Sequence, residues 1–567
     1  MRNLALLLIM AAAACAPAAP RAPAPEAPYD LVIERGRIVD GTGNPWFYGD
    51  VAVRGDRIAR VAPAGLLANA PATERLDARG RVVAPGFIDV ISHSRAALLD
   101  GDGRVLSKVT QGITTEIMGE STSNAPANEL TIGDVDLTDP AVRERATRFF
   151  GPRGFDVWLR AMEETGMSVN GGSFVGGGTI RRYGKGMAQG PPSPAELDTM
   201  RAAMVRAMED GAFGLATSLI YAPGDFATTE ELIELARVIG PYGGIYITHL
   251  RSEGDRFLEA LDEALRIGRE GGVPVQIYHL KAAGQRNWDR MEPAIAKIDS
   301  ARAAGQDVTA DMYPYPAAGT GLTSCLPAWA AADGKLFDNL RDPEMRARIR
   351  AEMVAEYSDW ENFCILAGPE GVMVVGLEQP ENEAWAGRRL SEIAEARGQH
   401  WADAAIDLII SEEQRIFTMY FLMSEDNVAT QMRQPWISFG TDAGGTDPEQ
   451  TTRLVHPRGY GTYPRILGRY VREQEVITLE EAVRKASSAV ANRLGIQDRG
   501  LLREGMLADI VVFDPATIRD RATYDEPHQL SVGVEHLFVN GVAVIRDAAH
   551  TGAMPGRIVR GPGYRGQ

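Results

Sequence analysis

The segments GIYITHL (residues 244–250) and VPVQIYHL (residues 273–280) are short apolar runs, and each carries a histidine next to its last residue. The residues between them show the apolar spacing of an amphipathic helix. An apolar run, a helix and a second apolar run form the unit expected of parallel strands with helical crossovers. The pair therefore predicts an α/β fold in which both histidines lie at the carboxyl ends of neighbouring strands.

Apolar runs of the same kind recur through the middle of the chain in a number close to that of a full barrel. The other candidate strands are residues 87–90, 114–118, 211–219, 307–315, 415–421 and 436–442. Capping-box signatures at residues 228–231 and 478–481 mark the starts of two helices. We therefore predict a (β/α)8 TIM-like barrel over residues 87–497. The segment from about residue 331 to 397 fits no single strand–helix unit. Its charge and helical periodicity predict an inserted subdomain.

Both ends of the chain change to the pattern of short antiparallel strands. Residues 29–40 and 50–61 alternate apolar and polar side chains. Near the other end, residues 509–513 have the pattern of a buried strand and residues 534–544 that of a hairpin. These distant segments together predict one small β-sandwich beside the barrel. The predicted sandwich consists of residues 29–86 and 498–567.

The first 28 residues have the pattern of an export signal followed by an Ala/Pro-rich tether. Arg2 is a brief basic region, residues 4–10 are an apolar run too short to span a bilayer, and small residues 11–14 precede Cys15. Cys15 resembles the lipidation site of bacterial lipoproteins, whereas the lack of leucine three residues upstream favours an ordinary cleaved signal. Both alternatives stay open. In either case we expect export, to the periplasm or to a membrane as an anchored lipoprotein.

Charge and cysteine content exclude several kinds of site. The 567-residue chain has 76 acidic and 59 basic residues, and its net charge of -17 would repel nucleic acid, which we do not expect as a partner. Only Cys325 and Cys364 follow the signal, and neither belongs to a CxxC pair, so we expect no zinc ribbon and no disulfide framework. Any metal must therefore be held by histidine and carboxylate side chains. The oligomeric state stays open, including a homo-oligomer.

Three histidines and one aspartate lie where predicted barrel strands end, and barrel enzymes build their active sites from such strand ends. His93 follows the first candidate strand, while His249 and His279 are one strand–helix unit apart, so that two imidazoles can face one ion. Asp442 ends an apolar run before a glycine turn. Near a metal ion, such a carboxylate can take a proton from a water and return it to a leaving nitrogen. These residues predict a metal-dependent hydrolase.

Eight motifs occur in order along the chain after the tether. They are DLVIERGRIVDG (30–41), APGFIDV (84–90), QGITTEIMG (111–119), LIYAPG (219–224), THLRSE (248–253), YHLK (278–281), HPRGYG (456–461) and ADIVVFDP (508–515). In this order the chain resembles the D-aminoacylase (N-acyl-D-amino-acid deacylase) branch of the amidohydrolase superfamily. The resemblance implies a zinc-bearing barrel, the two strand-end histidines as ligands and Asp442 as the catalytic carboxylate. It also implies that Arg251, Lys281 and Tyr313 bind the substrate carboxylate.

Two positions depart from the family pattern. The family carries a His-x-His pair after its first barrel strand, and here Ile91 replaces the first histidine, ahead of His93. A cysteine ligand usually follows the second strand, where this chain has Gly119 and then Glu120. Because catalytic zinc accepts two histidines and a glutamate, we predict Glu120 as the third ligand, with Glu116 as the alternative. We expect one tightly held zinc ion in preference to two, with His93 as a further ligand or a group that orients substrate or water.

The predicted function is hydrolysis of the amide bond of an N-acyl amino acid or a related small-molecule amide. Tyr221 and His456 are expected to line the pocket beside the carboxylate-binding residues. One alternative is a cyclic-amide hydrolase of the dihydropyrimidinase or dihydroorotase kind, although its binuclear site needs the full His-x-His pair. The other is a non-catalytic surface binding protein on a decayed hydrolase barrel, suggested by the two altered ligand positions.

Overall fold

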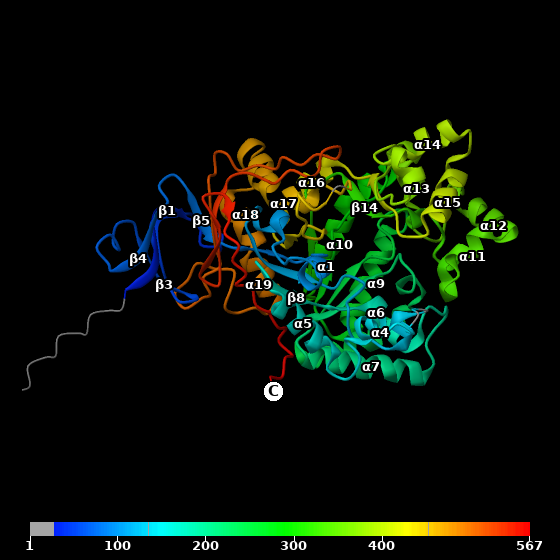
Figure 1. Cartoon of the computed structure of the whole chain (residues 1–567), viewed down its shortest axis with the longest axis horizontal. Coiled ribbons are helices and arrows are strands. Elements are labelled where there is room, and N and C mark those ends of the chain that lie inside the picture. Colours follow the sequence, from blue (N-terminus) through cyan, green and yellow to red (C-terminus); the bar gives the residue numbers. More distant parts are fainter. Residues whose placement is uncertain (1–27, 134, 136, 452, 567) are drawn as a thin grey trace, which may run out of the picture.

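The computed structural model describes residues 28–133, 135, 137–451 and 453–566. The predicted export signal, including Cys15, lies outside the described residues. Figure 1 shows a β-domain at one end of the long axis and a helical subdomain at the other, with the barrel between them. Among the described residues, no helix is both long and apolar enough to cross a membrane.

A barrel of eight parallel strand positions occupies the centre of the described chain. In order around the ring the strands are β6 (Phe87–Asp89), β7 (Ile113–Met118), β8 with β9 (Asn170–Ser173 and Val175–Gly176), β10 (Gly214–Ser218), β11 (Ile245–His249), β12 (Val275–Ile277), β13 (Val308–Met312) and β17 (Ile437–Phe439). The interrupted strand β8–β9 pairs with β7 on one side and β10 on the other. The ring closes where the Asp442 N–H donates to the Ile91 carbonyl oxygen at 2.9 Å. The predicted TIM-like barrel is thus confirmed.

Helices cover the outside of the barrel and supply the crossovers. In chain order the helices before the inserted subdomain are α1 (Arg95–Leu99), α2 (Leu106–Val109), α3 (Glu129–Ile132), α4 (Pro140–Thr147), α5 (Gly154–Thr165), α6 (Gly177–Lys185), α7 (Pro194–Glu209), α8 (Thr229–Ile239), α9 (Phe257–Gly271) and α10 (Met291–Ala303). After it come α16 (Glu425–Met432), α17 (Arg458–Arg465), α18 (Leu479–Ala486) and α19 (Ser488–Leu494). The Thr228 and Thr478 hydroxyls each accept a backbone N–H at 3.2 Å, which confirms both predicted helix starts.

One barrel strand differs from the prediction. The run at residues 415–421, predicted to belong to the barrel, forms β16 (Phe417–Phe421), which pairs antiparallel with two subdomain strands. β13 pairs directly with β17, and the eighth strand position is filled between β7 and β10 by β8 and β9, whose sequence NGGSFVG contains no apolar run. Glycine is required there because a Cβ at Gly176 would lie 2.4 Å from the carbonyl oxygen of Ser121. Close packing of the backbone therefore determines which residues this strand can contain, and a search for apolar runs does not detect such a strand.

The inserted subdomain lies between β13 and β17 and is wider than the predicted residues 331–397. Its sheet has the order β14 (Ala317–Gly321), β16, β15 (Val372–Val374). Its helices are α11 (Leu336–Arg341), α12 (Pro343–Met353), α13 (Phe363–Ala367), α14 (Leu390–Arg397) and α15 (Trp401–Glu412). Buried side chains of these elements form an apolar core distinct from that of the barrel. The insertion is therefore a folded unit and not a long loop.

A disulfide within the subdomain corrects the expectation that cysteine supplies no framework. Cys325 and Cys364 are bonded, with their Cα atoms 5.1 Å apart and a separation of 39 positions in sequence. Cys325 ends a short 3-10 helix, η4 (Leu322–Cys325), and Cys364 lies in α13. The spacing of the two cysteines carries no signal of this pairing, because the packing of two separate segments brings them together.

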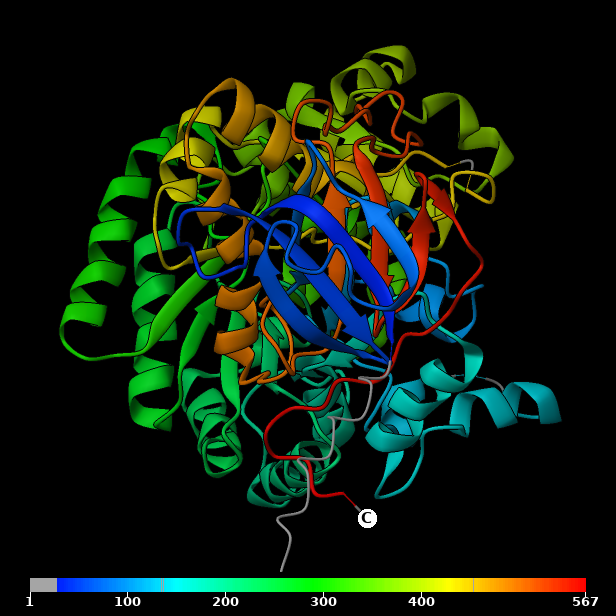
Figure 2. The same ribbon diagram turned by 90° about the vertical axis from the view of Figure 1, so that its left-hand side faces the viewer.

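Both ends of the chain share one nine-stranded sheet, the β-domain. Its order is β21-β20-β19-β18-β5-β1-β2-β3, with β4 paired to β1. The strands are β1 (Tyr29–Ile38), β2 (Phe47–Arg54), β3 (Arg57–Pro63), β4 (Ala72–Asp77), β5 (Val82–Pro85), β18 (Ile510–Phe513), β19 (Val534–Val539), β20 (Val542–Arg546) and β21 (Ala549–His550). Figure 2 shows the blue N-terminal strands beside the red C-terminal ones. Val51 and Ile58 from one arm of the sheet share a core with Ile510 and Phe538 from the other, as predicted for a sandwich.

Candidate metal centre and substrate cavity

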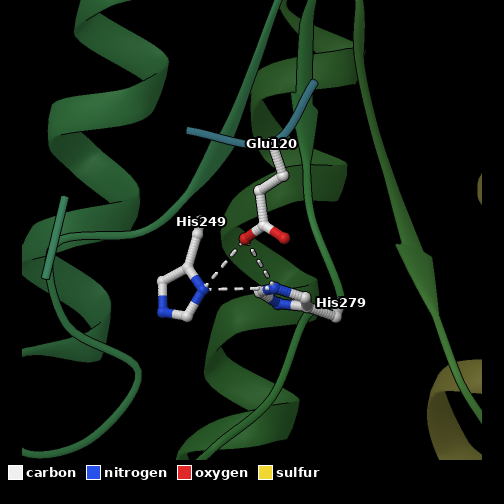
Figure 3. A group of neighbouring side chains, drawn as sticks. All are labelled: Glu120, His249 and His279. Carbon is white, nitrogen blue, oxygen red and sulfur yellow. Dashed lines mark hydrogen bonds and ion pairs between the residues drawn. The ribbon is translucent and has the colours of Figure 1, made fainter. Parts of the chain in front are cut away.

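Three side chains from three different strands converge at the carboxyl end of the barrel (Figure 3). Glu120 follows β7, His249 ends β11 and His279 follows β12. Glu120 Oε1 lies 3.2 Å from His279 Nε2 and 3.4 Å from His249 Nδ1. The two imidazole nitrogens are 3.1 Å apart. All three side chains are at most 8% exposed, so the donor atoms are screened from bulk water.

This triangle of donor atoms fits one tetrahedral metal ion. Zinc binds imidazole nitrogen and carboxylate oxygen at about 2.0–2.2 Å, which places neighbouring ligand atoms of a tetrahedron about 3.3 Å apart. The observed separations of 3.1, 3.2 and 3.4 Å agree with that value. Two histidines and one glutamate are also a ligand set of catalytic zinc sites that keep one position open. The residues present therefore fit the metal that the sequence predicts.

A second group of donor atoms shares Glu120 with the first. His93 Nε2 lies 3.3 Å from Glu120 Oε2 and 2.9 Å from Asp442 Oδ1. The two oxygens of Glu120 thus face two donor sets. The second set is poorer, because it has one imidazole and because Asp442 Oδ2 lies 2.8 Å from the cationic Arg458 Nη1. Ile91, which stands where the family has a histidine, is buried among apolar side chains and offers no ligand atom.

Glu116, the alternative ligand, belongs to a different buried cluster. Ser92 Oγ donates to Glu116 Oε2 at 2.9 Å, and Lys108 Nζ lies 3.6 Å from Oε1. Lys108 also contacts Asp89 Oδ2 and Thr441 Oγ1, each at 2.7 Å. This cluster connects β6 with the segment after β17. Glu116 therefore helps to hold the closure of the barrel and does not face the histidine ligands.

Two site residues adopt the left-handed backbone region. The φ angles are 30° for His279 and 50° for Asp442. A residue other than glycine in this region costs about 1–3 kcal/mol, and such residues cluster at functional sites where the surroundings hold them. Asp311 Oδ1 accepts the His279 N–H at 2.7 Å, and the Ile91 carbonyl oxygen accepts the Asp442 N–H at 2.9 Å. The surrounding structure thus fixes both side chains in place.

Glu253 is a site residue that the sequence analysis missed. Its Oε1 accepts a hydrogen bond from Lys281 Nζ at 2.7 Å and lies 3.2 Å from His279 Nδ1. Its Oε2 lies 3.4 Å from His249 Nε2. One carboxylate therefore lies against both imidazoles on the side that faces away from Glu120, where its negative charge favours the binding of a cation by the two rings. The sequence feature that could have revealed Glu253 is its position four residues after a ligand histidine, in the motif THLRSE.

The metal-binding side chains open onto a cavity of about 730 Å³. Four of the residues predicted to bind substrate line it, namely Lys281, Tyr313, Tyr221 and His456. Arg251 does not, which corrects that prediction. Its guanidinium donates to Glu263 Oε2 at 2.8 Å and to the backbone carbonyl oxygens of Asp225 and Ala227 at 3.0 and 2.9 Å. Because β11 has already ended at His249, strand alternation no longer directs the Arg251 side chain inward.

Arginines from other segments line the cavity instead. Arg458, from the motif HPRGYG, is buried, and its guanidinium carbon lies 4.7 Å from the centre of the Tyr313 ring. Arg95 and Arg415 line the same cavity. The motif therefore contained a second site residue beside His456, which sequence reasoning did not separate from its neighbours. One wall of the cavity comes from the subdomain, through residues that include Thr320 and Phe363.

The electrostatic surroundings keep the site carboxylates ionised. Burial raises the pKa of Asp442, but the charges of Arg458 and His279 outweigh it and lower the pKa to about 2. Burial likewise raises the pKa of Glu120, and hydrogen bonds from three histidines outweigh it, so that the pKa is well below its usual value. In Glu253 the neighbouring histidines and Lys281 outweigh burial and lower the pKa to about 2. Ionised carboxylates are the form that binds a cation and accepts a proton.

Known proteins match this chain over nearly its whole length. D-aminoacylase of Alcaligenes xylosoxydans xylosoxydans is 35% identical, over 94% of this chain and 98% of that protein. A family model described as "Amidohydrolase family" matches residues 414–545.

Solved structures show the same architecture. One is a D-aminoacylase structure, which is described in terms of a binuclear metal center with "one-metal activation and second-metal attenuation". It has a TM-score of 0.78 at 33% identity and covers 94% of this chain and 100% of that one. N-acyl-D-glutamate deacylase from Bordetella bronchiseptica, in complex with zinc and a phosphonate inhibitor, has a TM-score of 0.76 at 32% identity with the same coverage. L-hydantoinase from Arthrobacter aurescens, at 14% identity and a TM-score of 0.54 over 95% of this chain and 99% of that one, shares the fold alone. The chain therefore belongs to the D-aminoacylase branch of the metal-dependent amidohydrolases and is a hydrolase of carbon–nitrogen bonds other than peptide bonds.

Proposed function

We propose that this hydrolase cleaves the amide bond of N-acyl-D-amino acids at a zinc ion held by Glu120, His249 and His279. The observation that carries the proposal is the convergence of these three donor atoms beside an ionised Asp442. The relatives named D-aminoacylase and N-acyl-D-glutamate deacylase support the substrate class and the D series. Substrate hydrolysis by protein of measured zinc content tests it.

The residues of the site divide the chemistry between them. A divalent ion in this position supplies polarisation of the scissile carbonyl and lowers the pKa of a nearby water. Asp442, which is ionised, takes a proton from the attacking water and later donates it to the leaving nitrogen. His93, at 2.9 Å from Asp442 and 3.3 Å from Glu120, holds the orientation of both carboxylates.

The carboxylate of the amino-acid half is placed beside Lys281, Tyr313 and Arg458. Lys281 Nζ lies 5.8 Å from the centre of the Tyr313 ring, and the Arg458 guanidinium carbon lies 4.7 Å from it. All three side chains are buried, so their attraction for an anion is only weakly screened by salt. Arg458 thus takes the place that the sequence analysis gave to Arg251.

One tightly held ion is favoured over two. The donor set of Glu120, His249 and His279 is complete, whereas the set around His93 lacks a second imidazole because Ile91 replaces it. Asp442, the remaining donor of the second set, is already paired with Arg458. The description of a D-aminoacylase as activated by one metal and attenuated by a second is consistent with this count.

The two alternative functions receive less support. A cyclic-amide hydrolase needs a complete binuclear site, and the buried Ile91 withholds one ligand. The likeness to hydantoinases extends to the fold alone. A non-catalytic binding protein would have no use for His279 and Asp442 held in a costly left-handed conformation beside an intact donor set.

Removal of a ligand histidine should remove metal and activity together. His249→Ala or His279→Ala leaves two donors, so we expect zinc to fall from about one ion per chain to a small fraction, and amide hydrolysis to become undetectable. Elemental analysis and an assay with N-acetyl-D-leucine measure both. Glu120→Ala should behave alike, and the matched control Glu116→Gln, buried outside the donor set, should keep its zinc. Two equally tight ions in active protein would contradict the proposed ligand set.

Asp442→Asn should separate proton transfer from metal binding. The amide preserves the shape of the side chain but does not accept a proton, so we expect kcat to fall by about 10²–10⁴-fold while KM changes little. Zinc content should stay at the level of the unmodified protein, because the three other donors are untouched. Loss of zinc in this variant would instead make Asp442 a required ligand.

Lys281→Met should weaken the recognition of a free carboxylate. A charge-assisted hydrogen bond contributes roughly tenfold to hundredfold, so kcat/KM for N-acetyl-D-leucine should fall by that factor. The value for N-acetyl-D-leucinamide, whose end is neutral, should change much less. Zinc content is the control, since Lys281 Nζ also lies 2.7 Å from His279 Nδ1. Equal losses on both substrates would show that Lys281 acts only through the histidine.

We propose further that the chain is exported, to the periplasm or as a lipid-anchored protein. The signal-like residues up to Cys15 motivate this, and the Cys325–Cys364 disulfide supports it, because such bonds persist in oxidising compartments. Protein isolated from its native host should begin at or near Cys15 and show no free thiol at positions 325 and 364. Intact-mass and thiol-labelling measurements test this, and an unprocessed Met1 or two free thiols would refute export.

A further inference from the structure

Arg95 is a cavity arginine without an acidic partner. It opens α1, two residues beyond His93, and its side chain is half-buried where it lines the cavity. Nη1 donates to Asn124 Oδ1 at 3.0 Å and Nη2 donates to Thr122 Oγ1 at 2.9 Å, and both acceptors are neutral. Within the described part of the chain, no carboxylate forms an ion pair with it. A guanidinium has five N–H donors, so several of them are left for a ligand.

The other buried charges of the cavity are matched. Lys281 is paired with Glu253 at 2.7 Å, and Arg458 with Asp442 at 2.8 Å. Glu120 faces the metal position. Arg415 also lacks a carboxylate partner among the described residues, but its side chain is exposed and water can solvate it. Among the described residues that line the cavity, Arg95 is therefore the cation that is partly removed from water without a carboxylate to compensate its charge.

Arg95 has no direct contact with the residues assigned to the substrate's own α-carboxylate. Among the described residues, it shares no hydrogen bond or ion pair with Lys281 or Arg458, and both of its acceptors belong to the segment after β7. A carboxylate held by Lys281 and Arg458 does not require the donors of Arg95, so these stay available to a second anion. The planar fork of a guanidinium matches the two oxygens of a carboxylate, and such a pair is stronger than a neutral hydrogen bond.

We infer that Arg95 is a second anion subsite and that the preferred substrates are N-acyl amino acids carrying two carboxylates. One is the α-carboxylate, and the other belongs either to the amino-acid side chain or to the acyl group. The inference rests on the proposed function and names its substrate class. Both sources of the second carboxylate present the same chemistry to Arg95, and a paired substrate set distinguishes them.

The experiment compares two pairs of nearly isosteric substrates. N-acetyl-D-glutamate with N-acetyl-D-glutamine tests the side chain, and N-succinyl-D-leucine with N-succinamoyl-D-leucine tests the acyl group. In one pair, kcat/KM of the unmodified zinc enzyme should be roughly tenfold or more higher for the charged member. Arg95→Gln should abolish that preference while the neutral member is still hydrolysed. Arg95→Lys keeps the positive charge but lacks the two-pronged guanidinium, so it should show an intermediate preference. This second variant keeps the test decisive if Arg95→Gln does not fold.

Arg415→Gln is the matched control, because it removes one positive charge from the same cavity. Its preference should stay close to that of the unmodified protein. Equal rates for the charged and neutral members of both pairs would overturn the inference while leaving amide hydrolysis standing. Loss of the preference in Arg415→Gln but not in Arg95→Gln would place the subsite elsewhere and overturn it as well. Inactivity toward all four substrates would reject the proposed function and, with it, this inference.

Discussion

The buried ammonium of Lys108 joins the first and the last strand of the barrel. It contacts Asp89 on β6 and Thr441 just after β17, each at 2.7 Å, where the two strands share only an isolated bridge in place of a full ladder. His93 and Asp442 follow directly beyond this point, so their distance of 2.9 Å depends on it. Removal of one partner from a buried charge pair costs about 3–5 kcal/mol, so this closure is strongly constrained.

The barrel and the main donor atoms could be predicted because one rule connects them. Parallel strands with helical crossovers bring all their carboxyl ends to one rim, so His249, His279 and Asp442 had to lie near one another once each was recognised as a strand end. Glu120 could be predicted on ligand chemistry, since a metal that has lost a thiolate needs another anionic donor. In these cases the periodicity of the sequence carries the three-dimensional information.

The features that could not be predicted depend on space and on distant contacts. The glycine-rich strand β8–β9 has no apolar pattern, because contact with its neighbours excludes side chains at Gly176. Arg251 follows the end of its strand, and its direction is set by Glu263 on the helical layer. The Cys325–Cys364 bond depends on how two subdomain segments pack. Each of these outcomes is decided by a contact between separate elements or by the space available to a side chain, and local sequence spacing reveals neither.

The cavity is built from two modules whose hydrophobic cores are separate. The barrel supplies the donor atoms and the proton acceptor, whereas the subdomain supplies a wall that includes Thr323 and Phe363, each close in sequence to a cysteine of the disulfide. Substitutions in this wall alter the shape that a substrate meets without repacking the strands that carry the histidines. Divergence of substrate range among such enzymes can therefore proceed within the insertion, while the chemical step is inherited unchanged.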